Sequence, residues 1–93
     1  MTMQKYEFQV VLASVDQMTE EVSNALHDAG CDDGTPFSSE GMAAVGFTRE
    51  ADSLEEAIRS AVRNVQKAGY SVARVEPADE PIFSRINREL AKP

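Results

Sequence analysis

Residues 42–75 read MAAVGFTREADSLEEAIRSAVRNVQKAGYSVARV, and this stretch decides the fold class. Residues 42–48 alternate between larger apolar and smaller side chains, which is typical of a strand. Apolar residues then recur at steps of three and four, the pattern of an amphipathic helix, at Leu54, Ala57, Ile58, Ala61, Val62, Val65 and Ala68. Residues 70–75 are rich in β-branched and aromatic side chains, which predicts a further strand. The order strand, helix, strand follows.

Local signals mark both ends of this helix. Ser53 and Glu56 form a capping box, in which the serine hydroxyl accepts a hydrogen bond from a first-turn amide. Gly69 is a common C-terminal stop. We therefore expect the helix to run from residue 54 to residue 68.

The part of the chain before residue 42 predicts a strand, a helix and a short strand. Residues 5–12 have the period-2 alternation of a half-buried strand. Asp16 or Thr19 can cap a short amphipathic helix that Gly30 ends, with its apolar face at Met18, Val22, Leu26 and Ala29. Residues 35–38 are a weak strand that contains Pro36, so this strand belongs at a sheet edge and forms a hairpin with residues 42–48.

The C-terminal part predicts a linker and one more helix. The linker at residues 77–81 is acidic and stiffened by two prolines. Residues 82–90 predict a short helix with Phe83, Ile86 and Leu90 on one side and Ser84, Arg85, Asn87, Arg88 and Lys92 outward. We expect residues 1–77 to form the domain and residues 78–93 to form the linker and helix.

The predicted order βαββαβ is that of an α+β, ferredoxin-like fold, a four-stranded antiparallel sheet with two helices on one face. The expected core joins two sets of side chains: Phe8, Val10, Leu12, Val45 and Phe47 from the sheet, and Val22, Leu26, Ile58, Val62 and Val65 from the helices. The other sheet face should present a mixture of polar and small residues: Glu7, Gln9, Val11, Ala44 and Gly46. That face could contact a second subunit, another partner or the terminal segment.

Composition limits the classes of function. The 93 residues fit one domain, and the net charge of −7 argues against direct binding to nucleic acid. The charge is uneven, because residues 1–48 contain one basic and eight acidic residues while residues 49–93 sum to zero. No membrane span and no secretory signal is predicted, so we expect a cytoplasmic protein.

Candidate catalytic and metal-binding residues are few. His27 and Cys31 lie among acids around the expected helix end, but no matching ligand pair recurs elsewhere. Paired acids at residues 20–21, 32–33 and 55–56 are explained by helix first turns and a turn. Arg59, Arg63 and Lys67 form a basic stripe that is either a solvated helix face or a docking strip. We therefore expect no enzyme activity, no cofactor and no metal.

Three segments carry a resemblance to a known group of proteins: residues 28–33, 47–58 and 72–77. Together they resemble small uncharacterised bacterial proteins in which a βαββαβ module precedes a helix-turn-helix. The pattern Ser84, Ile86 and Leu90 resembles the start of that helix-turn-helix, but the chain ends at residue 93 without a turn or a recognition helix. The resemblance implies the front module of such a protein.

Two functions follow as hypotheses. The first is a non-enzymatic protein-interaction or dimerisation module of a small bacterial regulator, antitoxin-like or associated with a transcription factor. The second is an acidic phage-type inhibitor that mimics DNA, as anti-CRISPR proteins do. The expected partner-binding residues are Glu20, Glu21, Asp32, Asp33, Phe83, Ile86 and Leu90.

The apolar stripe of the terminal helix has two possible sites of burial. Because so short a helix is not stable alone in water, the stripe must pack against something. We expect a clasp on a neighbouring subunit rather than a lid on the same chain, since the stiff linker projects the helix away.

Overall fold

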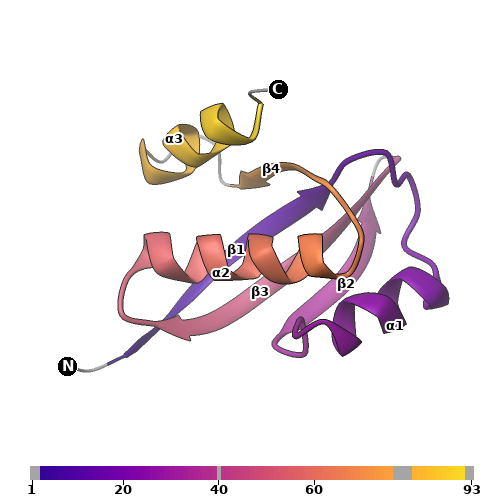
Figure 1. Cartoon of the computed structure of the whole chain (residues 1–93), viewed down its shortest axis with the longest axis horizontal. Helices are drawn as coiled ribbons and strands as arrows, with labels where there is room; N and C mark the ends of the chain where they lie inside the picture. Colours follow the sequence, from indigo (N-terminus) through magenta and orange to yellow (C-terminus); the bar gives the residue numbers. More distant parts are fainter. Residues whose placement is uncertain (1–2, 40, 77–80, 92–93) are drawn as a thin grey trace.

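The computed structural model describes residues 3–39, 41–76 and 81–91, apart from the side chains of Ser39 and Pro81. Its elements follow the order β1 (Gln4–Leu12), α1 (Glu20–Asp28), β2 (Gly34–Ser39), β3 (Met42–Ala51), α2 (Leu54–Lys67), β4 (Val72–Glu76) and α3 (Pro81–Leu90). The expected domain boundary at residues 77 and 78, and the linker up to residue 80, lie outside the described residues. Figure 1 shows α2 across β1 and β3, with α3 beside β4 and α1 toward β2.

The four strands form one sheet in the order β2-β3-β1-β4, and every neighbouring pair is antiparallel. The central pair runs without interruption from Gln4 opposite Ala51 to Val11 opposite Ala44. The register of β1 and β4 shifts between Val11 and Leu12, where Ala73 is the extra residue of a bulge. The α+β class with a four-stranded antiparallel sheet is therefore confirmed.

The expected core is confirmed except for Val22, which is partly buried against it. Val10, Val45 and Phe47 of the sheet and Leu26, Ile58 and Val65 of the helices are all at most 1% exposed and belong to one cluster. Phe8 stacks on Phe47 with ring centroids 5.5 Å apart. Side chains of α1, α2 and α3 all join this cluster, so the three helices cover the same face of the sheet.

The helix caps follow the predicted chemistry. Thr19, rather than Asp16, is the N-cap of α1, and its hydroxyl accepts a hydrogen bond from the amide of Val22 at 3.2 Å. Ser53 caps α2 by accepting from the amide of Glu56 at 3.1 Å. Gly30 follows α1 with a φ of +108°, a conformation that side-chain-bearing residues rarely adopt.

The strands differ in length from the predicted ones. β3 continues to Ala51 instead of ending at residue 48, because the inward alternation of Phe47 passes through Arg49 to the buried Ala51. β4 begins at Val72, and β2 extends from Gly34 to Ser39. The longer β3 is important because it turns Arg49 toward the helices.

The terminal helix α3 packs on its own chain, which corresponds to the lid and not to the favoured clasp. Phe83 and Ile86 are each 2% exposed, and Phe83 lies against Phe8 with ring centroids 6.5 Å apart. Asn87, expected to face outward, instead makes two hydrogen bonds with the backbone of Val75. Being one turn from Phe83, Asn87 shares the buried side of the helix.

Candidate functional site

The acidic residues expected to bind a partner do not form one cluster. Glu20 and Glu21 lie in the first turn of α1, whereas Asp32 and Asp33 follow its C-terminal end. A nine-residue helix is about 14 Å long, so the two pairs are separated by that length. Asp33 also has an internal partner, because its carboxylate receives two hydrogen bonds from Arg49 at 2.7 and 2.8 Å.

Arg49 connects β3 to α2 and to the turn between α1 and β2. Besides Asp33, its guanidinium donates to the carbonyl oxygen of Gly30 at 3.0 Å and to Ser60 Oγ and Asn64 Oδ1 of α2 at 3.2 and 2.7 Å. All five N–H donors of the side chain are thus used. The side chain is 11% exposed, and its hydrogen bonds to Asp33 raise the pKa of Arg49 above its ordinary value. Arg49 therefore has a structural role, since its hydrogen bonds join parts of its own chain.

Cys31 and His27 do not come together. Cys31 is 3% exposed, and burial raises the pKa of its thiol, which opposes nucleophilic reactivity. The side chain of His27 is 71% exposed, and its nearest acid is Asp28 at 3.9 Å. Within residues 3–39, 41–76 and 81–91, no group of three His, Cys, Asp or Glu residues is placed to hold a metal ion.

The basic stripe of α2 is mainly a structural face. Arg59 pairs with Glu55 of the same helix at 2.8 Å, as expected for residues four apart, and with Glu89 of α3 at 3.0 Å. These hydrogen bonds, first that to Glu89 and then that to Glu55, raise the pKa of Arg59 above its ordinary value. Arg59 of this stripe therefore holds α3 against α2.

The three apolar residues proposed to bind a partner lie in this same helix contact. Phe83 and Ile86 are buried in the core of their own chain, and Leu90 is half-buried against it. A groove of about 290 Å³ remains between α2 and α3, with Val62, Ile86 and Leu90 among its lining residues. The apolar stripe is therefore used internally.

Each edge of the sheet has one position that is blocked against an added strand. At the β4 edge, the side-chain amide of Asn87 accepts from the Val75 amide at 2.6 Å and donates to the Val75 carbonyl oxygen at 2.9 Å. At the β2 edge, the backbone N–H of Thr48 donates to the carbonyl oxygen of Asp33. Hydrogen-bonded and non-hydrogen-bonded pairs alternate along antiparallel strands, so the pair of Pro36 with Val45 is non-hydrogen-bonded and the backbone of Pro36 faces away from β3. A proline at that position has no N–H to offer to an added strand.

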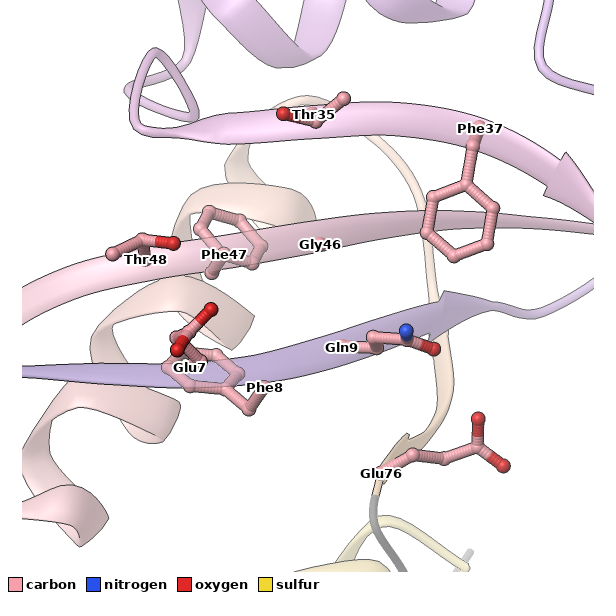
Figure 2. A pocket seen from close by; sticks show the side chains of 9 residues that line it. All are labelled: Glu7, Phe8, Gln9, Thr35, Phe37, Gly46, Phe47, Thr48 and Glu76. Atoms are coloured by element: carbon pink, nitrogen blue, oxygen red, sulfur yellow. The ribbon is translucent and has the colours of Figure 1, made fainter.

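The face of the sheet opposite the helices carries the more distinctive feature. Figure 2 shows the side chains of Glu7, Gln9, Phe37, Thr48 and Glu76 around the bare backbone of Gly46. They line an open hollow of about 540 Å³. A second hollow of about 200 Å³ lies beside it and shares Gln9, Phe37 and Glu76. We call the pair the sheet-face hollow.

Gly46 produces the floor of the sheet-face hollow. It lies in the middle of β3, opposite Gln9 of β1 and Thr35 of β2, and neither register is interrupted there. A Cβ at this position would lie 3.8 Å from Phe37 Cε1 and 3.9 Å from the Thr35 carbonyl oxygen, which is ordinary contact. Neither a bulge nor a close neighbour requires this glycine, and the absence of a side chain here leaves the space of the hollow.

The walls of the sheet-face hollow combine an aromatic ring with carboxylates. Phe37 is half-buried and lies outside the core cluster. Glu76 is paired with Arg74, whose Nε lies 3.2 Å from its carboxylate. Among the residues that the structure describes, none makes an ion pair with Glu7. The carboxylate of Glu7 therefore lines the hollow without an ion-pair partner among the described residues.

Comparisons of the chain with protein-family models, curated proteins and solved structures find no match. Fold and chemistry therefore carry the functional argument. In the part of the chain that the structure describes, no helix has both the length and the apolar composition needed to cross a membrane.

Sequence reasoning identified part of this site. Glu7, Gln9 and Gly46 were expected on the face away from the helices, and they lie there. Phe37 was missed as a site residue because its strand was weak and contained Pro36. The usable signal was the hairpin register, which places Phe37 opposite Ala44 and on the same face as Gly46.

Proposed function

We propose that this protein is a non-enzymatic protein-interaction module that binds its partner on the uncovered face of the sheet. The single observation that supports this most is the sheet-face hollow, where a glycine in an unbroken central strand leaves room beside an aromatic ring. Backbone surfaces of this kind allow a partner to approach closely. The hollow has carboxylates, amides and hydroxyls on its walls.

The protected edges support binding through the face rather than through strand addition. Addition of a partner strand needs free N–H and C=O groups along an edge. Asn87 occupies those groups at Val75, and Pro36 lacks one of them. A partner that reads side chains on the face needs neither edge.

The architecture we propose for the module is ferredoxin-like. The element order βαββαβ, with β1 and β3 in the centre of the sheet, supports this arrangement. The resemblance of three segments to the front module of bacterial helix-turn-helix proteins supports a role in a regulator. Mimicry of DNA has less support, because the acids at the two ends of α1 are separated and Asp33 is bound to Arg49.

Site-specific photocrosslinking tests this proposal. A photoreactive amino acid at Thr35, on the open face, should give protein adducts in cells, whereas the same amino acid at Gln66, exposed on α2, should not. Mass spectrometry of the adducts identifies the partner, including a second copy of the chain. Equal adducts at both positions, or adducts only at Gln66, would refute the assignment of the binding face.

A further inference from the structure

We infer that the sheet-face hollow receives an arginine side chain from a basic protein partner. This inference rests on the proposed function and specifies the chemistry of the partner. Three properties of the hollow support it: its openness to solvent, its charge and the order of its side chains along the sheet.

The position of the hollow favours a side chain carried by a macromolecule. Small-molecule pockets bury most of their ligand's surface in a cleft. The hollow of about 540 Å³ instead lies on the surface of a sheet, with Gly46 and Gln9 on its floor. A side chain that enters such a hollow is held in place by the rest of its own protein.

The charge of the hollow selects a cation. Glu7 contributes a carboxylate without an ion-pair partner among the described residues, and the whole chain has a net charge of −7. Phosphates and other anions are repelled by this charge, while a basic surface is attracted over a distance. Arg74, a cation beside the hollow, is already paired with Glu76. Lys5 lies two positions before Glu7 on the same face of β1 and makes no ion pair with it.

The order of the lining residues fits the length of an arginine. The edge of the Phe37 ring reaches the space above Gly46, as the 3.8 Å approach to an ideal Cβ there shows. Glu7, opposite Thr48, forms the next pair on the same face of the sheet after the pair of Gln9 with Gly46. Neighbouring pairs on one face are about 7 Å apart along a strand. The aliphatic stem can therefore lie on Gly46 against Phe37 while the guanidinium reaches Glu7.

The guanidinium suits this position better than an ammonium. Its planar fork can donate two parallel hydrogen bonds to one carboxylate, and its weak hydration lowers the cost of lying on a surface. The chain contains such a two-fold contact, since Nε and Nη2 of Arg49 donate to the two carboxylate oxygens of Asp33. On the open face itself, Arg74 donates one hydrogen bond to Glu76.

NMR titration of the full-length protein tests the inference. The probe is a blocked pentapeptide, Gly-Gly-Arg-Gly-Gly, and its control carries citrulline, the neutral isostere, in place of arginine. We expect the arginine peptide to shift the backbone amide signals of Glu7, Gln9 and Gly46, and the citrulline peptide to leave them unchanged. Equal shifts with citrulline, or equal binding of a lysine peptide, would overturn the assignment of a guanidinium.

Three variants locate the site. Glu7→Gln and Phe37→Leu should each weaken binding of the arginine peptide by about 2- to 5-fold, from the usual strength of exposed ion pairs and ring contacts. Glu21→Gln removes the same charge from the exposed first turn of α1 and should leave the affinity unchanged. If Glu21→Gln weakens binding as much as Glu7→Gln does, general charge attraction explains the binding and the inference fails.

The same experiment separates this inference from the proposed function. If the amide signals of the open face shift with protein concentration alone and the arginine peptide has no effect, a second copy occupies the face. That result would support the open face as an interaction surface and would overturn the assignment of an arginine side chain. Absence of adducts at Thr35 in the photocrosslinking experiment would remove the interaction surface itself.

Discussion

Replacement of Phe83 by alanine tests whether α3 is part of the folded domain. The ring is 2% exposed and packs on Phe8, so its removal leaves a cavity between α3 and the sheet. Truncation of a buried phenylalanine costs about 3–5 kcal/mol. A domain of this size is stable by only about 5–14 kcal/mol, so Phe83→Ala should remove a large fraction of the free energy of unfolding. The melting temperature should fall by about 12 °C or more.

Urea denaturation followed by circular dichroism measures this loss, and Ser84→Ala is the matched control because Ser84 is the exposed neighbour on the same helix. The control should change the free energy of unfolding by less than about 0.5 kcal/mol. Sedimentation of both variants completes the test. An unchanged unfolding midpoint for Phe83→Ala, together with a fall in molar mass from dimer to monomer, would refute the packing on its own chain and restore the clasp.

Three further predictions concern the internal contacts. Arg49→Met should lower the free energy of unfolding by about 2–4 kcal/mol in urea denaturation, because it leaves buried acceptors unpaired, and Arg49→Lys should recover part of the loss; a loss below about 1 kcal/mol would contradict this. Burial raises the pKa of Cys31 above its ordinary 9.0, so the unfolded thiol ionises first and stability should fall as the pH rises above about 9. Cys31→Ala should have a smaller fall over the same pH range, and an equal slope in both proteins would count against the prediction. Asn87→Leu should speed hydrogen exchange at the Val75 amide by about 10-fold, and unchanged exchange would show that the side-chain amide does not protect this edge.

Local sequence signals predicted the elements and the core well. Caps, glycine stops and apolar periodicity act over a few residues, and in this chain they agree with one another. Ser53 and Thr19 cap the helices as their positions suggest, and the alternation around Val10 and Val45 places both in the core. The main errors arose where a side chain's role depends on residues far away in the sequence.

Arg49 illustrates why such roles were missed. Its partners lie 11 to 19 positions away in the sequence, on helix α2 and on the turn that follows α1. A single charged residue after a strand predicts a solvated strand end. The strand was therefore expected to end at residue 48, whereas β3 continues to Ala51. Period-2 spacing from Phe47 through Arg49 to Ala51 was the available signal, but it required a buried charge, which is rare without a matching acid.

The terminal helix shows a different limit of sequence reasoning. Its apolar stripe predicted burial correctly, but a stripe does not specify which surface covers it. The stiffness expected of the linker favoured a clasp, whereas the contacts of Asn87 with Val75 and of Glu89 with Arg59 tie α3 to its own chain. Those contacts depend on which strand lies at the edge, and strand order is a property of the whole fold.

The contact between Asn87 and Val75 explains why a small sheet can stop growing at four strands. An extra strand would satisfy the Val75 backbone, but it would carry an unpaired edge of its own about 4.8 Å further out. A side-chain amide satisfies the N–H and the C=O of Val75 without adding another strand edge. A single asparagine therefore blocks strand addition at Val75 without adding a strand to the sheet.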